Sequence, residues 1–241
     1  MQRSVTLAVL AFVALAAPRP AAALDVAPWD AVLQAHGHRG GVDYGALKAD
    51  EEAMANLDRF LASVATMSES EGLASWLNAY NATVVKAVVD RYPMRSVMDT
   101  PGFFDRVPHR IAGRMRTLDA VENQLIRPRF QDARVHFALN CAAFSCPALS
   151  SRAFRAGSLD RTLDRLAARA VRSNMHVRVS EGRVQVSKIF EWFAEDFTRG
   201  GQTVLGWIRS HDDGGRLADV PADAELSYRR YDWRLNDRPR A

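Results

Sequence analysis

The sequence predicts a single α+β domain that is rich in helix and carries a small antiparallel sheet. Apolar residues recur at helical spacing in several stretches, most clearly over 158–172. Apolar and polar residues alternate over 176–180 and again over 183–187, on either side of a Glu-Gly pair, which is typical of a β-hairpin. Helices and strands do not alternate as βαβ units, so a doubly wound parallel sheet is disfavoured.

Two helices are predicted in the first third of the chain. Apolar residues fall at helical spacing over 46–67, with charged residues on the opposite side. Ser68 followed three residues later by Glu71 is typical of a capping box, which we expect to open the second helix. Pro93 ends that helix, because proline has no N–H to donate and restricts the residue before it.

Less regular structure is expected in the middle of the chain. Prolines and glycines over 93–116 predict an irregular connection that contains one hairpin. Thr117 is expected to cap a short helix over 118–126, which Pro128 ends. The apolar run 134–139 is predicted to be a short buried strand.

The last part of the chain alternates between helix and extended structure. After the helix over 158–172 and the hairpin, helical patterns recur over 189–197 and 202–210. Residues 226–233 are predicted to form a strand or an extended arm that docks on the body of the domain.

Residues 1–23 have the organisation of a secretory signal peptide. Arg3 precedes the apolar run 5–17, and a group of small residues ends at Ala23, after which we expect cleavage. The alternative is an uncleaved membrane anchor, but the apolar run is short for crossing a bilayer, which takes ~20 residues, so a cleaved signal is favoured. We therefore expect a periplasmic or extracellular protein whose domain is 24–241, with no stable membrane insertion once the signal is removed.

Composition excludes several functional classes. Of the 241 residues, 48% are hydrophobic and 25% are charged, as in ordinary soluble globular proteins. The net charge of +4 falls to +2 without the signal's two arginines, which is too small for a nucleic-acid-binding surface. Only two cysteines are present, so a four-cysteine zinc or iron–sulfur site is excluded. The chain has no G-x-G-x-x-G, G-x-x-x-x-G-K or G-x-S-x-G motif, and we expect no cofactor.

A polar pair is predicted inside a buried helix. The run 72–85 has no charged residue, so its helix is expected to be buried on nearly all sides. Asn78 and Asn81 are three positions apart and share one face of it. An unpaired buried amide costs ~1–3 kcal/mol, so both side chains need partners. They either hold the backbone of a loop, or they bind substrate and orient a catalytic group.

The segment 134–147 places both cysteines close to a histidine. A thiol beside an imidazole is the minimal requirement for thiol catalysis, with His136 as the base for Cys141 or Cys146. In a strand, His136 and Cys141 face opposite ways, so His136 reaches Cys141 only if the chain turns near Leu139. Two cysteines five positions apart are also typical of a disulfide that closes a small loop, of a redox pair, or of zinc ligation with a distant fourth ligand.

Glu122 is a candidate partner for the histidine. It flanks the apolar stripe of the helix predicted over 118–126 and faces either solvent or the interior. If it faces the interior, Arg127 and His136 are its natural partners, and an acid that holds His136 completes an arrangement like a catalytic triad.

Together these motifs resemble the domain-of-unknown-function 547 family over 42–236. The resemblance implies one shared domain and supplies no reaction; bacterial members of that family often look exported, and similar domains end longer plant proteins with a leucine-zipper region. This chain has Ala142-Ala143-Phe144 where a serine is expected among the small residues. The runs that carry the resemblance are Val42-Asp43-Tyr44, Trp76-Leu77-Asn78-Ala79-Tyr80-Asn81-Ala82, Ile111-Ala112-Gly113-Arg114, Leu118-Asp119 with Glu122, His136-Phe137-Ala138-Leu139-Asn140-Cys141, Ser145-Cys146-Pro147, Ser187-Lys188-Ile189-Phe190, Trp192 to Asp196-Phe197, and Tyr231-Asp232-Trp233-Arg234-Leu235-Asn236.

The favoured hypothesis is an exported thiol-dependent hydrolase or acyl transferase that acts on a small molecule or a peptide. The thiolate attacks a carbonyl, and an amide or backbone N–H groups stabilise the oxyanion. The alternative is a non-catalytic periplasmic binding or interaction module in which Cys141–Cys146 is a structural disulfide. No nucleic acid is expected as a partner, and the sequence does not indicate an oligomeric state. The predicted site residues are Cys141, Cys146, His136, Asn78, Asn81 and Glu122.

Overall fold

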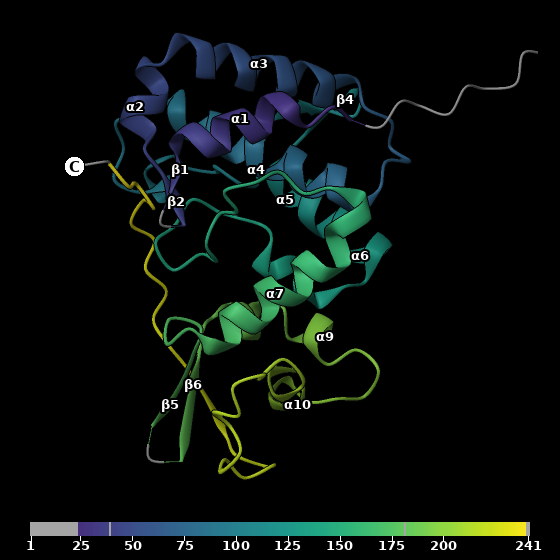
Figure 1. Cartoon of the computed structure of the whole chain (residues 1–241), viewed down its shortest axis with the longest axis vertical. Helices are drawn as coiled ribbons and strands as arrows, with labels where there is room; N and C mark the ends of the chain where they lie inside the picture. The colour runs from purple at the N-terminus through teal and green to yellow at the C-terminus, as the bar shows by residue number, and fades with distance from the viewer. Residues whose placement is uncertain (1–23, 39, 181, 240–241) are drawn as a thin grey trace, which may run out of the picture.

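The computed structural model describes residues 24–38, 40–180 and 182–239 (Figure 1). The signal peptide expected over 1–23 lies outside the described residues. The predicted fold class is confirmed, because helices dominate and the strands form small sheets. Within the described residues, no helix is both long and apolar enough to cross a membrane.

Four helices form the N-terminal part of the molecule, where α1 and α3 run side by side above α4 (Figure 1). The prediction of one helix over 46–67 is wrong in one respect, because the helix is interrupted at Asp50. The Asp50 carboxylate accepts the N–H of Ala53 at 3.0 Å and so starts a new helix. The bounds are α1 Ala27–His36, α2 Tyr44–Ala49, α3 Glu51–Thr66 and α4 Leu73–Val89.

The capping box predicted at Ser68 is absent. The helix α4 begins after Gly72, which has no side chain to cap it. The Ser68 hydroxyl instead pairs with Ser70 at 2.7 Å, and the Glu71 carboxylate accepts the hydroxyl of Ser75 at 2.7 Å. As expected, α4 is buried on nearly all sides, and it forms the centre of the larger apolar cluster.

Two small hairpins and a short helical turn flank these helices. The hairpin predicted within 93–116 is confirmed, with His109 opposite Arg116. The bounds are β1 Gly37–His38 paired with β2 Gly41–Val42, β3 His109–Ile111 paired with β4 Arg114–Arg116, and a 3-10 turn over Val97–Asp99.

The helix that Thr117 caps is longer and wider than predicted. The Thr117 hydroxyl accepts the N–H of Ala120 at 3.1 Å, which confirms the cap. Pro128 does not end the helix, because the preceding turns are π-helical and the N–H of Arg127 bonds to the carbonyl of Glu122, five residues back. This wider turn accommodates a proline that a regular α-helix does not tolerate. The bounds are α5 Leu118–Ala120, the π-helix Val121–Ile126 and α6 Arg127–Phe130.

The prediction of a strand over 134–139 is wrong. The segment is a 3-10 helix, Ala133–Phe137. The Asp132 carboxylate accepts the N–H of Arg134 at 2.9 Å, and the carbonyl of Val135 accepts the N–H groups of Ala138 and Leu139, both at 2.9 Å. The backbone groups are paired locally, so the segment needs no partner strand.

The second half of the chain forms a smaller apolar cluster around α7 and a three-stranded sheet. The predicted hairpin is confirmed, and the tail adds a strand that runs parallel to β6. The helix predicted over 189–197 is two short helices separated at Phe193. The bounds are a 3-10 turn Ala156–Ser158, α7 Leu159–Arg172, β5 Val177–Ser180, β6 Arg183–Val186, α8 Ile189–Trp192, α9 Ala194–Phe197, α10 Val204–Ser210 and β7 Leu226–Tyr228.

An extended arm after β7 runs back along one side of the molecule to β2 (Figure 1). It forms isolated bridges from Arg234 to Ser96, from Leu235 to Ala143 and from Asp237 to Val42. The arm therefore joins the two halves of the fold and crosses beside the cysteine segment.

Candidate functional site

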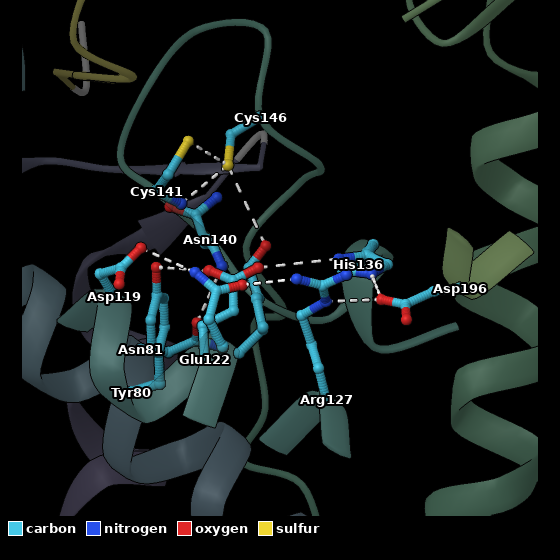
Figure 2. Close-up of polar contacts among 12 residues, drawn as sticks. Tyr80, Asn81, Asp119, Glu122, Arg127, His136, Asn140, Cys141, Cys146 and Asp196 are labelled. Atoms are coloured by element: carbon cyan, nitrogen blue, oxygen red, sulfur yellow. Dashed lines mark hydrogen bonds and ion pairs between the residues drawn. The ribbon is translucent and has the colours of Figure 1, made fainter. Parts of the chain in front are cut away.

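A cavity of about 170 Å³ lies where the two halves of the fold meet. Figure 2 shows several of its side chains, with the two sulfur atoms at one end and His136 at the other. Its walls come from α4, the α5–π-helix segment, the 3-10 helix with the cysteine loop, α8 and the C-terminal arm. The residues that line it are Tyr80, Phe104, Asp119, Glu122, Asn123, His136, Leu139, Cys141, Cys146, Pro147, Ile189, Trp192, Phe193, Tyr231 and Trp233.

The two cysteines are free thiols that face each other across a short loop (Figure 2). Their sulfur atoms are 2.6 Å apart, and the Cys146 sulfur also accepts the N–H of Cys141 at 2.7 Å. The Tyr231 hydroxyl lies 3.3 Å from the Cys141 sulfur. Cys146 is buried, whereas Cys141 is partly exposed.

The surroundings of the two thiols separate their acidities. Burial raises the pKa of Cys141, but hydrogen bonds from Cys146, from the Tyr231 hydroxyl and from the N–H of Ala143 outweigh burial and hold that pKa below its ordinary value. Burial and the neighbouring Cys141 sulfur raise the pKa of Cys146 well above its ordinary value. Cys141 therefore ionises first, while Cys146 and Tyr231 keep their protons as donors.

Asn140 fixes the shape of the cysteine loop. Its amide nitrogen donates to the carbonyl of Pro147 at 2.7 Å, and its amide oxygen accepts the N–H of Ala142 at 3.0 Å. Asn236 of the C-terminal arm donates to the same oxygen at 3.1 Å. Ala142 has a φ of +61°, a conformation that non-glycine residues seldom adopt, and these bonds hold it there. The sequence places Asn140 in the motif without indicating this role.

His136 lies between two carboxylates. Its Nε2 is 2.7 Å from Oδ2 of Asp196, and its Nδ1 is 3.7 Å from Oε1 of Glu122. Its ring stacks on Phe193 with centroids 3.9 Å apart. Arg127 holds Asp196 from the other side, with Nε 2.6 Å from the same carboxylate oxygen. Figure 2 shows this row from Arg127 through Asp196 to the imidazole.

The protonation of this row follows from its charges. Burial lowers the pKa of His136, but Asp196 and Glu122 outweigh burial and raise it above 6.5. Burial raises the pKa of Asp196, but the bonds from His136 and Arg127 dominate and lower it to about 2. Asp196 is therefore a carboxylate, and the two acids favour the imidazolium form of His136 more than water does. The Nδ1 of His136 is buried, and no group among the described residues is close enough to hydrogen-bond it.

Glu122 faces the interior and lines the cavity. The hydroxyl of Tyr80 donates to its Oε2 at 3.3 Å. Burial and the Glu122 charge raise the pKa of Tyr80 well above its ordinary value, so Tyr80 remains a donor. Of the two interior partners considered for Glu122, His136 is the one that faces it.

Asn78 and Asn81 use their amide groups to hold loop backbone, and neither lines the cavity. Asn78 donates to the carbonyl of Phe154 at 2.8 Å and accepts its N–H at 2.9 Å. Asn81 donates to the carbonyl of Ala138 at 2.9 Å and accepts the N–H of Asn140 at 2.9 Å. The predicted polar pair is thus a structural clamp, and Asn81 connects α4 directly to the cysteine segment.

Of the predicted site residues, the cavity brings together Cys141, Cys146, His136 and Glu122. No hydrogen bond joins His136 to either sulfur within the described part of the chain. Zinc ligation gains no support, because the described residues contain no group of three or more His, Cys, Asp or Glu side chains arranged to hold an ion. Sequence reasoning missed Asp196 as the partner of His136, and Tyr231 as the partner of Cys141. Both lie in the motifs that carry the family resemblance.

Comparison with known proteins gives one match. Residues 64–169 match the family model described as "Protein of unknown function, DUF547". The matched segment contains all six predicted site residues, whereas Asp196 and Tyr231 follow it in the chain. No curated protein and no solved structure matches the chain. The match over residues 64–169 confirms the resemblance to the DUF547 family seen in the sequence.

Proposed function

We propose that the protein is a thiol-dependent hydrolase or acyl transferase with Cys141 as its nucleophile. One observation carries the proposal: Cys141 lines a cavity and receives the hydrogen bonds that favour its thiolate, while neighbouring Cys146 and Tyr231 keep their protons. A thiolate is the reactive form of cysteine, and a lowered thiol pKa is typical of catalytic cysteines.

The proposed reaction proceeds through a thioester. The Cys141 thiolate attacks the acyl carbon of an ester or amide, and the carbon–heteroatom bond breaks as the thioester forms. The leaving oxygen or nitrogen takes a proton from His136, which becomes neutral. Water then attacks the thioester and gives its proton back to His136, releasing a carboxylic acid and the Cys141 thiolate. An acceptor alcohol or amine in place of water gives acyl transfer.

This scheme assigns His136 a different role from the base expected from the sequence. Its Nε2 is held by Asp196 and its pKa is raised, so it is a poor acceptor for a thiol proton. The Nδ1–H of an imidazolium faces Glu122 at 3.7 Å without a hydrogen bond, and this is the proton that we assign to the leaving group. Cys141 does not need a base, because its thiolate is stabilised by hydrogen bonds.

The cavity indicates the size and character of the substrate. A volume of about 170 Å³ fits one acyl group or one side chain rather than a whole large ligand. Trp192, Tyr231 and Trp233 pack together along one wall, with ring centroids 4.8–5.9 Å apart. Trp192 is 46% exposed and extends this wall to the surface. We therefore propose a small molecule or peptide that presents an apolar group to the cavity.

We also propose that the protein acts outside the cytoplasm, in the periplasm or the extracellular space. The support is the arrangement of Arg3, the apolar run 5–17 and the small residues before Leu24. In such a compartment, the competing function is a binding module with a structural Cys141–Cys146 disulfide. The 2.6 Å separation of the two sulfur atoms supports that competing function, because an oxidising compartment favours a bond between neighbouring thiols.

Thiol labelling separates the two functions. Protein purified from the export compartment without reductant is treated with iodoacetamide over a pH series, and the modified residue is identified by mass spectrometry. The enzyme proposal predicts rapid labelling of Cys141 below pH ~8, where an unperturbed thiol is mostly protonated and reacts slowly. If neither cysteine is labelled by iodoacetamide until reductant is added, the result supports the binding module and contradicts the enzyme proposal.

Acyl-enzyme trapping tests the chemistry itself. A panel of activated aryl esters is mixed with wild-type protein, and the expected product is a thioester on Cys141 with release of the aryl alcohol. Cys141→Ser abolishes the thioester, whereas Cys146→Ala weakens but does not abolish it. Absence of any acyl adduct in a protein whose Cys141 labels readily contradicts acyl transfer.

A further inference from the structure

Two further hollows lie beside the cysteine loop and adjoin each other. One has a volume of about 160 Å³ and the other about 930 Å³, and both are lined by Phe144 and Met175. We call the two hollows together the arginine trough. Its basic members are Arg169, Arg229, Arg230, Arg234, Arg238 and His176.

The arginine trough concentrates positive charge. Its five arginines face a single carboxylate among the lining residues, that of Asp232, which is 2.5 Å from Arg234. The trough therefore has a local excess of four positive charges, spread over the two hollows. It attracts anions at distances shorter than the ~8 Å screening length of physiological salt.

Several of these arginines have their donors available. Within the described residues, no carboxylate is within ion-pair distance of Arg169, Arg230 or Arg238. The guanidinium carbon of Arg238 lies 4.8 Å from the centroid of the Phe144 ring, and that of Arg234 lies 5.1 Å from it. Stacking on an aromatic ring engages the face of a guanidinium and leaves its N–H edge for a ligand.

A buried histidine with an unpaired nitrogen completes the smaller hollow. His176 is 4% exposed and lines this hollow. Its Nδ1 is buried without a hydrogen-bond partner among the described residues. A buried polar atom without a partner destabilises the empty hollow, and a ligand that hydrogen-bonds this nitrogen removes that cost. Burial and the charge of Arg229 lower the pKa of His176 to about 4, so its ring is neutral when the hollow is empty.

Two of the last carbonyl groups of α7, which ends beside the trough, are paired. The last carbonyl groups of a helix carry partial negative charge, which repels anions. Here Arg216 Nη1 donates to the carbonyl of Val171 at 2.8 Å, and the N–H of Ser173 donates to that of Ala170 at 3.0 Å. Both carbonyl groups are thus paired, and the basic side chains dominate the hollow.

We propose that the arginine trough is a second ligand site, which binds a molecule bearing two or more oxyanion groups, either phosphate or carboxylate. Guanidinium groups bind both kinds of group through paired N–H donors. The smaller hollow holds one oxyanion among Arg169, Arg238 and His176, and the larger one holds another near Arg230. The proposal does not depend on the thiol chemistry proposed above, because Cys141 lines neither hollow. Cys146 lines the smaller hollow, and Tyr231 and Trp233 line the larger one, so the second site adjoins the first.

Calorimetry with two small polyanions tests the site. Sodium pyrophosphate and sodium citrate are titrated into the full chain at constant ionic strength, and each serves as a probe for one class of oxyanion. The double variant Arg169→Gln/Arg238→Gln is expected to bind the preferred anion at least about tenfold more weakly, which corresponds to ~1.4 kcal/mol. The matched control is Arg161→Gln/Arg165→Gln, which removes the same charge from α7 outside the trough, and it is expected to bind as the wild type does.

NMR of the histidine rings gives an independent readout. The bound anion is expected to move the titration of His176 to higher pH, because a negative charge beside the ring stabilises its protonated form. Three results overturn the proposal. The first is equal weakening of anion binding in both double variants, and the second is no binding of either anion at about 10 mM. The third is a His176 signal that does not move when the anion saturates the protein. Tighter binding of pyrophosphate indicates a phosphate ligand, and tighter binding of citrate indicates a carboxylate ligand.

Discussion

The Nε2 atom of His136 lies 2.7 Å from Oδ2 of Asp196, although the two residues are 60 positions apart in the chain. Asp196 also accepts from Arg127 at 2.6 Å, so one carboxylate serves two cationic partners. The imidazole is therefore held in one orientation at the wall of the cavity. Its charge state depends on Asp196 more than on the cysteines.

Asp196→Asn is expected to lower the pKa of His136, because the largest contribution that raises this pKa comes from Asp196. NMR titration of His136 measures the change directly. The variant is also expected to lose about 1–2 kcal/mol of stability near neutral pH, allowing for partial screening by solvent. Asp213→Asn, which removes the exposed partner of Arg172, is the matched control and should leave both quantities nearly unchanged.

The pH dependence of stability has a defined sign for each member of this pair. Asp196 has its pKa lowered from 3.8 to about 2, so its contribution is present above pH ~4 and is lost as pH falls toward ~2. His136 has its pKa raised above 6.5, so its contribution is complete below pH 6.5 and is lost as pH rises through the raised value. Urea unfolding across pH 2–9 should show both losses, and Asp196→Asn should reduce both.

Asn78→Ala and Asn81→Ala are expected to destabilise the protein by about 2–4 kcal/mol each, because each removes a donor and an acceptor that serve buried backbone. Their effects on chemistry should differ. Asn78 holds Phe154, which follows the cysteine loop and does not line the cavity, so the folded variant should label at Cys141 as the wild type does. Asn81 holds Asn140, so its loss should also change the labelling rate. Identical labelling in both variants contradicts this assignment.

The sequence predicts several local features, though not the Ser68 cap or the break at Asp50, and it predicts long-range pairings poorly. Thr117 is recognisable as a cap, and the strands over 176–180 and 183–187 as a hairpin, because both features depend on residues a few positions apart. The run 134–139 has the composition of a strand, but a strand needs a neighbour, and Asp132 starts a 3-10 turn instead. Composition carries no information about whether a neighbouring strand is present.

The same distinction applies to the candidate site. His136 and the cysteines were identifiable because they are close in sequence and are chemically distinctive. Asp196 reaches His136 only through the packing of α9, and Tyr231 reaches Cys141 only through the course of the C-terminal arm. Both depend on tertiary structure, and aspartate and tyrosine are too common in sequences to indicate a site by themselves.

Tyr231→Phe is expected to raise the pKa of Cys141, because it removes a hydroxyl donor 3.3 Å from the sulfur and keeps the ring that packs on Trp192 and Trp233. The rate of iodoacetamide labelling as a function of pH measures that pKa. A shift of about 0.5–1 unit to higher pH is expected, which corresponds to ~0.7–1.4 kcal/mol. Tyr228→Phe, which alters an exposed tyrosine on β7, is the control. An unchanged profile in Tyr231→Phe removes Tyr231 from the set of thiolate donors.

Glu122→Gln tests whether His136 acts as the proton donor of the proposed reaction. The substitution keeps an acceptor for the Tyr80 hydroxyl but removes the charge that faces Nδ1 of His136, so the pKa of His136 should fall. If the protonated imidazole assists the leaving group, activity is lost above that pKa, and the alkaline limb of the kcat profile moves to lower pH in the variant. Esters with very good leaving groups need no such proton, so their kcat should change little. A pH-independent loss of activity with all esters instead identifies Glu122 as a residue that acts by contact with the substrate.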